Sequence, residues 1–143
     1  MITRRTPLRR TPVRRSKART AKRRAEIKVI AAVRARVADR DYYCRLYWQD
    51  TETRTAIAAV FGACGGPSEW AHWGPWRRSK TRGQDPHERH TTRGSLMLCA
   101  VHHRTGPSAY DAGGMTITAL YERRGCNGRL RFKRGDAVWT EPT

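Results

Sequence analysis

A set of metal-ligand side chains in the middle of the chain constrains the fold more than any other feature. Cys44, Cys64, Cys99 and His102 are of the types that bind zinc, and the last two lie one turn apart if a helix begins there. A chain of 143 residues builds only one modest core. A tetrahedral ion would stabilise so small a domain, so we predict a structural Zn²⁺ bound by these four residues.

The spacing of the cysteines leaves alternatives open. Nineteen residues separate Cys44 from Cys64, whereas paired ligands in a zinc knuckle normally lie two to four residues apart. One alternative is that Cys44 or Cys64 is a buried free thiol. Another is that Cys126, the remaining cysteine, replaces Cys44 as a ligand.

The charge of the chain limits its partners. Lysine and arginine total 30 against 12 acidic residues, for a formal net charge of +18 and a pI of about 11.2. This excess indicates a polyanionic partner, either nucleic acid or an anionic membrane. The sequence has no long apolar run and no amphipathic segment with a bulky apolar face, so we predict DNA and no membrane association. Phosphate contacts alone do not distinguish DNA from RNA.

Residues 1–24 form a basic segment without any acidic residue. Pro7 and Pro12 prevent a long helix, and few apolar side chains are present, so we predict a flexible arm. The arm is expected to contact phosphates, the alternative being a nonspecific solubilising tail. The arginines assigned to phosphate contact are Arg9, Arg10, Arg14 and Arg15. The segment lacks the apolar stretch of a secretory signal, so we expect a cytoplasmic protein.

The rest of the pattern predicts an α+β fold. A helix is expected from about Ala18 to Arg40, packed on the core through Ile27, Ile30, Ala31 and Val37. Strand-like runs at 69–73 and 95–99 flank a polar loop, and a helix is expected directly after Cys99. We interpret residues 25–112 as this helix plus a central domain.

Residues 113–143 are interpreted as a C-terminal β extension. β-Branched residues alternate in 115–121, Asn127-Gly128 predicts a turn into a second strand, and a short last strand is expected at 137–140.

The order of strand, loop, strand and helix resembles the HNH (ββα-metal) endonuclease family, in particular its small bacteriophage members. In that family a first strand ends near Asp-His-Ile, a loop carries an Asn, a second strand ends in Leu-Cys, and a helix opens with Cys-x-x-Cys-His. EWAHW (69–73), SLMLC (95–99) and the Cys-x-x-His-His run that starts at Cys99 resemble these pieces. The resemblance covers about residues 41–112. It implies a divalent catalytic metal, Mg²⁺ or Mn²⁺ and alternatively Zn²⁺ or Ni²⁺.

The resemblance implies roles for single residues. His72 falls at the general base, and His103 at the last histidine, which binds the catalytic metal. Cys99 and His102 fall on the second half of the structural zinc site, with His102 in place of the usual Cys. Cys64 falls on the first half.

The chain departs from the family at two positions. Ala71 precedes His72 where the family often has a metal-binding Asp, and Gly94 or Ser95 stands where the family has its Asn. The second metal ligand therefore has several candidates. In order of preference these candidates are Asp111, His90, His87 and Glu69. His90 is alternatively expected to orient His72, and we count it with His72 and His103 as a catalytic candidate.

These residue types suit phosphodiester hydrolysis. A neutral imidazole, with a pKa of about 6.5, can take a proton from water at neutral pH. A divalent ion neutralises charge on the phosphorane and the leaving oxygen. The basic residues of the loop are predicted to contact flanking phosphates, the alternative being an ordinary solvated charge run. These loop residues are Arg77, Arg78, Lys80 and Arg82. Trp70 is expected to pack, whereas Trp73 and Trp76 could pack or stack on bases.

Three functions compete at this stage. The first is a metal-dependent DNA endonuclease that nicks or cleaves phosphodiester bonds. The second is a zinc-stabilised protein that binds DNA or RNA on the same scaffold without cutting it. The third is a basic structural or nucleoid-type protein, which leaves the ordered Cys/His run unexplained.

Overall fold

The computed structural model describes residues 17–77 and 80–143. The predictions for Arg9, Arg10, Arg14, Arg15 and Arg78 lie outside the described residues.

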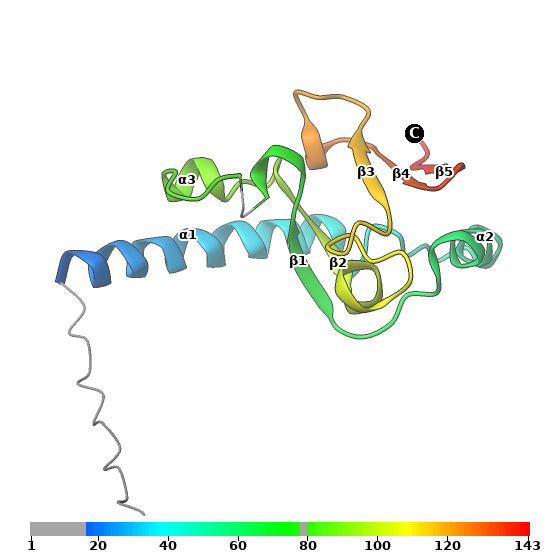
Figure 1. Ribbon diagram of the computed structural model, residues 1–143, viewed down its shortest axis with the longest axis horizontal. Coiled ribbons are helices and arrows are strands. Elements are labelled where there is room, and N and C mark those ends of the chain that lie inside the picture. The colour runs from blue at the N-terminus through cyan, green and yellow to red at the C-terminus, as the bar shows by residue number, and fades with distance from the viewer. Residues whose placement is uncertain (1–16, 78–79) are drawn as a thin grey trace, which may run out of the picture.

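Helix α1 (Lys17–Asp41) is the longest element of the described chain. It begins at Lys17, so residues 17–24 of the predicted arm are helical. The prediction that its apolar residues pack on the core holds only near its end, where Val37 is buried, while Ile27 is 54% exposed. The N-terminal half of α1 extends past the sheets and is flanked there by α3 on one side (Figure 1), so much of its surface remains uncovered.

Helix α2 (Thr51–Phe61) is an element that the sequence pattern did not lead us to expect. Its beginning is capped by Asp50, whose carboxylate accepts a hydrogen bond from the Thr53 amide at 2.7 Å. Its end is set by Gly62, which has a φ of 85°, a value that favours glycine. Ile57 and Phe61 bury one side of this helix in the core.

A two-stranded antiparallel sheet lies at the centre of the fold. Strand β1 (Ser68–His72) pairs with β2 (Ser95–Cys99), with Ser68 opposite Cys99 and His72 opposite Ser95. The connection between them contains the 3₁₀ turn η1 (Gly74–Trp76) and the short helix α3 (Pro86–Arg89). β2 is buried along its whole length, and it crosses the C-terminal half of α1 (Figure 1). A single π-helical turn, η2 (Val101–Thr105), follows where a helix was expected.

The C-terminal residues form a second, three-stranded antiparallel sheet. Its order is β3 (Thr116–Ala119), β4 (Leu130–Arg134) and β5 (Ala137–Thr140). The predicted turn at Asn127-Gly128 is corrected, because Ala119 pairs with Leu130 and residues 120–129 form a long connection containing the 3₁₀ turn η3 (Gly125–Asn127). The tight turn of this sheet is at Gly135-Asp136, where Gly135 has a φ of 58°.

One core joins the two sheets. It combines Leu96 and Leu98 of β2 with Phe61 of α2 and Leu130 and Phe132 of β4. Trp73 and Trp76 belong to this packing: their rings stack with centroids 5.9 Å apart, and the Trp73 indole donates to the Ile117 carbonyl at 2.8 Å.

A buried ion network fastens the end of α1 to both sheets. The Asp41 carboxylate pairs with Arg45 at 3.1 Å and accepts a hydrogen bond from the Met97 amide of β2 at 2.9 Å. Arg45 also pairs with Glu141, which accepts from the Leu130 amide at 2.8 Å. Burial opposes the charge on Arg45, but hydrogen bonds to Glu141 and Asp41 outweigh it and raise its pKa.

The α+β class is confirmed: the described chain mixes helices with two small sheets and a Cys/His cluster that could bind a metal. None of its helices has the length and apolar character that a membrane span requires.

Candidate functional site

The four predicted zinc ligands form one buried cluster. The sulfurs of Cys44, Cys64 and Cys99 and a ring nitrogen of His102 all lie within 4.8 Å of one another. His102 Nδ1 is 3.5 Å from the sulfurs of Cys44 and Cys64 and 3.2 Å from that of Cys99. Cys44, Cys99 and His102 are each at most 3% exposed. The group could hold a metal ion.

Helix α2 explains how ligands so far apart in sequence meet. It occupies eleven of the residues between Cys44 and Cys64 and so lets both ends of the segment return to β2. The carbonyl of Gly62, its capping residue, accepts a hydrogen bond from His102 Nε2 at 2.9 Å. Since a carbonyl only accepts, Nε2 carries a proton, and in the neutral imidazole the lone pair of Nδ1 would face the three sulfurs.

The donor set and its spacing fit a structural metal such as zinc. A tetrahedral ion with Zn–S of about 2.3 Å and Zn–N of about 2.0 Å separates the nitrogen from each sulfur by about 3.5 Å. The observed separations are 3.2 to 3.5 Å.

The charges of the cluster call for a cation. Hydrogen bonds from Cys44 and Cys64 lower the pKa of the Cys99 thiol, whereas those to Cys44 and Cys99 raise the pKa of the Cys64 thiol. Burial would lower the pKa of His102, but hydrogen bonds with Cys44 and Cys99 raise it to about 10. A dication would favour the ionised sulfurs and the neutral imidazole together.

Cys126 lies outside this cluster, so the alternative in which it replaces Cys44 does not match the structure. Its side chain is fully buried beside the Arg40 and Arg45 network, and burial raises its pKa to about 12. It behaves as a small apolar core residue.

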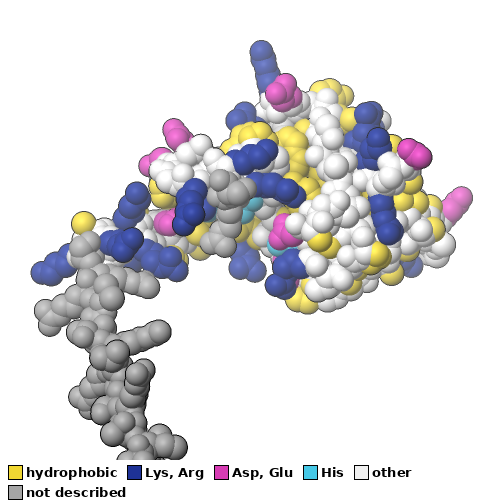
Figure 2. Space-filling view, viewed as in Figure 1, with side chains coloured by type: hydrophobic (Ala, Val, Ile, Leu, Met, Phe, Trp, Pro, Cys, Tyr) yellow, Lys and Arg dark blue, Asp and Glu magenta, His cyan; other side chains and the backbone are white. Residues whose placement is uncertain are grey.

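A separate cleft of about 830 Å³ collects most of the predicted catalytic residues. Figure 2 shows histidine side chains in a hollow bordered by basic ones. The cleft is lined by Ile30, Arg34, Glu69, Trp70, His72, Arg77, His90, His103, Arg104 and Asp111. α1, β1, η2 and the segments between them all contribute to it.

On one side of the cleft His72 is linked to His90. His72 Nε2 lies 3.0 Å from His90 Nδ1, and His90 Nε2 lies 3.1 Å from a carboxylate oxygen of Glu26 on α1. His90 is 4% exposed, and the Trp70 ring packs against His72 with centroids 4.4 Å apart. The hydrogen bond from His90 is the main cause that lowers the pKa of Glu26.

On the other side His103 lies between two carboxylates. Its Nδ1 is 2.8 Å from Glu69 and its Nε2 is 3.3 Å from Asp111. Asp111 comes close because its backbone amide donates to the His103 carbonyl at 3.0 Å, which folds the segment after η2 back onto that turn. Arg104 binds the same Glu69 carboxylate and is the main cause that lowers its pKa.

Basic side chains surround these groups. Arg34, Arg77 and Arg104 line the cleft, and Arg77 lies over the Tyr110 ring at 4.2 Å. Lys80 and Arg82 are exposed on the loop beyond it.

Several sequence candidates lie elsewhere. Ala71 is 1% exposed, so the position of the family's Asp points into the core. Ser95 is buried and donates to the Thr91 carbonyl at 2.7 Å, and Gly94 accepts from the Trp73 amide, so neither takes the place of the family's Asn. His87 is exposed on α3 and does not line the cleft.

Sequence reasoning missed Glu26, Arg34 and Arg104 and ranked Glu69 last. One signal was available for Glu26: it is the only acidic residue before Asp39 in an otherwise basic stretch. No sequence signal marks Arg34 or Arg104 among so many arginines.

Comparison of the chain with protein-family models, curated proteins and solved structures finds no match.

Proposed function

We propose that this protein is a metal-dependent DNA endonuclease of the HNH type. The observation that carries the proposal is the shared cleft: His72 on β1 and His103 on η2 line one cavity, and each imidazole is hydrogen-bonded through a ring nitrogen to a further side chain. Ionisable side chains that converge in one cleft are candidates for a functional site.

His72 is the general base in this proposal. Its link to His90 orients the ring, and a neutral imidazole held in this way can accept a proton from water. His90 itself serves as an orienting group, not as a metal ligand, because both of its ring nitrogens already face His72 and Glu26.

His103 Nε2 and Asp111 would hold the catalytic divalent ion. Asp111 is 54% exposed, so it is open to solvent, and it faces the Nε2 edge of the imidazole. Glu69 binds the Nδ1 edge and would act as the carboxylate that orients a metal-bound histidine. A bound Mg²⁺ or Mn²⁺ would stabilise negative charge on the phosphate and on the leaving oxygen.

The Cys44, Cys64, Cys99 and His102 cluster is proposed to bind a structural Zn²⁺, since three thiolates and one imidazole are soft ligands that favour zinc. The basic residues at the cleft are proposed to bind the phosphates on either side of the scissile bond. They include Arg34, Arg77, Arg104, Lys80 and Arg82.

The test is a supercoiled-plasmid assay with Mg²⁺, Mn²⁺ or EDTA. We expect metal-dependent nicking or cutting that falls by about 10²- to 10⁴-fold in His72→Ala, the range that a positioned base contributes. Binding to the plasmid should remain. His87→Ala is the matched control, because this histidine is exposed outside the cleft. Full cleavage by His72→Ala would remove His72 from the role of base.

The second candidate is a zinc-stabilised nucleic-acid-binding protein without cleavage activity. The observation that favours it is Ala71, whose core position supplies no metal ligand where the family often has an Asp. Within the described residues, the Cys/His cluster is also the one group of three or more close ligand atoms. Plasmid that is retarded but never cut, with every metal tried, would favour this function.

A further inference from the structure

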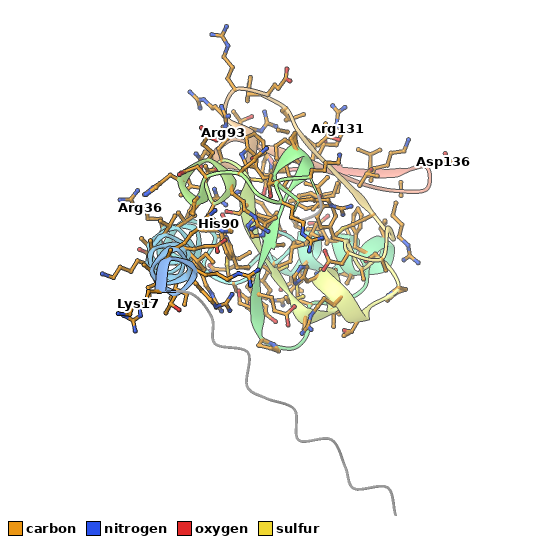
Figure 3. All side chains as sticks on the ribbon, turned by 60° about the vertical axis from the view of Figure 1, so that its left-hand side comes forward. Lys17, Arg36, His90, Arg93, Arg131 and Asp136 are labelled. Atoms are coloured by element: carbon orange, nitrogen blue, oxygen red, sulfur yellow. The ribbon has the colours of Figure 1, made fainter. Side chains whose placement is uncertain are left out.

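A chain of hydrogen bonds leads from helix α1 to the proposed base. Glu26 on α1 faces His90 Nε2 at 3.1 Å, and His90 Nδ1 faces His72 Nε2 at 3.0 Å. Figure 3 shows His90 beside α1, which is seen nearly end-on. His90 is 18 positions from His72 and 64 positions from Glu26 in the sequence. Its two ring nitrogens nevertheless link these two residues.

The chain has a direction, because its first member only accepts. Glu26 is ionised, since the hydrogen bond from His90 lowers its pKa, and Arg89 lies 3.3 Å from the same oxygen. His90 therefore carries a proton on Nε2. In neutral His90 the lone pair is then on Nδ1 and must accept a proton from His72 Nε2. The lone pair of His72 is consequently on Nδ1.

The opposite tautomer of His72 would meet a penalty. It would bring two nitrogen lone pairs within 3.0 Å of each other beside His90, which is 4% exposed. A buried polar group left without a hydrogen-bond partner loses its solvation without compensation, so this tautomer is disfavoured. The Trp70 ring, with its centroid 4.4 Å from that of His72 and 5.6 Å from that of His90, restricts rotation of both imidazoles away from this contact.

We propose that Glu26 is a positioning residue that fixes the tautomer of His72 through His90. This inference rests on the proposed function, in which His72 Nδ1 accepts a proton from the attacking water. The proton on Nε2 stays in the hydrogen bond to His90, and the positive charge on the imidazolium faces a chain that ends in a carboxylate. Helix α1 thus supplies a positioning residue for the proposed base as well as positively charged side chains.

The first measurement is independent of cleavage. Full-length, zinc-loaded protein labelled with ¹⁵N in its histidines is studied by long-range ¹H–¹⁵N correlation at a pH where His72 is neutral. We expect His72 as the Nε2–H tautomer in the wild type and a mixture of tautomers in Glu26→Leu, which removes the acceptor. Glu26→Gln keeps an acceptor without the charge and should lie between them.

The matched control is Asp39→Asn, which removes one negative charge from an exposed position on the same helix. It should leave the tautomer and the cleavage rate unchanged. If Glu26→Leu does not fold, the tautomer populations of His72 in Glu26→Gln decide whether Glu26 fixes the tautomer.

The second measurement is plasmid cleavage by the same variants. We expect kcat to fall by about 10-fold in Glu26→Leu with KM for DNA unchanged, because part of the 10²–10⁴ contributed by a positioned base depends on its tautomer. A change in KM alone would mean that Glu26 acts on binding and would overturn the proposal. Equal tautomer populations in the wild type and Glu26→Leu would also overturn it. Protein that shows the expected tautomers but never cuts DNA would instead contradict the proposed function.

Discussion

The two clusters of ligand-type side chains in this molecule are built in opposite ways. In the Cys/His cluster three of the four residues are at most 3% exposed, and the imidazole proton is bound by the Gly62 carbonyl. In the cleft Asp111 is 54% exposed, and the histidines are held by carboxylates and by each other.

Under the proposed function, the closed cluster serves stability and the open cleft serves catalysis. A closed site with four soft ligands leaves no position for a substrate, so an ion held there supports the fold. A half-open site with hard oxygen ligands, imidazoles and arginines retains room for water and phosphate. His102 and His103 are adjacent in sequence, yet the single turn η2 directs one into each site.

The largest effect expected is on the closed cluster. Cys99→Ser should remove bound zinc and the cooperative unfolding transition, because binding of a structural zinc contributes about 10–16 kcal/mol in small domains. Zinc content and thermal unfolding measure this. Lower pH should act in the same direction, since protons compete with the metal for thiolates and imidazole.

Cys126→Ser is the control, because Cys126 is equally buried but lies outside the cluster. The substitution should lower the free energy of unfolding by about 1–3 kcal/mol, because it buries a hydroxyl group, and it should leave the zinc content unchanged. Zinc retained in Cys99→Ser, with the same unfolding curve as the wild type, would contradict the structural site.

The next effect concerns the ion network that attaches the end of α1 to β2. Because α1 also lines the cleft, this network helps to position one wall of the cleft. Asp41→Ala leaves the buried Arg45 without one partner and frees the Met97 amide. We expect the free energy of unfolding to fall by about 3–5 kcal/mol. Asp39→Ala on the exposed face should change it by about 0.5 kcal/mol or less. Denaturant titration of both variants decides whether the network is structural.

A smaller effect is expected in the cleft itself. Glu69→Gln removes the charge that orients His103, and the metal concentration for half-maximal cleavage should rise by about 10- to 100-fold. The fold should be unaffected, in contrast to Cys99→Ser. Glu52→Gln, on the exposed first turn of α2, is the control. An unchanged metal requirement would assign Glu69 to the Arg104 ion pair alone.

The smallest effect is on binding outside both clusters. Deletion of residues 1–16 removes six arginines, and the slope of log Kd against log salt should become shallower by at most about 5. Cleavage of bound DNA and zinc content should stay the same. A salt slope equal to that of the full chain would mean that this segment does not contact phosphates.

Local signals in the sequence predicted much of the framework. The α+β class, the strands that carry His72 and Cys99, and the proximity of Cys99 to His102 all follow from residue type and short-range spacing. The spacing of Cys44 and Cys64 left alternatives open, and only the fold brings these two side chains to Cys99 and His102. Helix α2 was missed although Asp50 and Gly62 mark its two ends. The turn at Asn127-Gly128 was wrong because the pairing of Ala119 with Leu130 is a long-range choice that no dipeptide encodes.

What the sequence by itself determined is the chemistry that the chain offers: soft ligands, imidazoles and a large excess of arginine. Only the tertiary structure decided which groups meet. Glu26 and His90 are 64 residues apart, and they lie together because α1 passes beneath the hairpin connection. Ala71 points into the core and leaves Glu69 and Asp111 to flank His103. Such contacts depend on how elements pack, and packing is a property of the whole core, not of any local pattern.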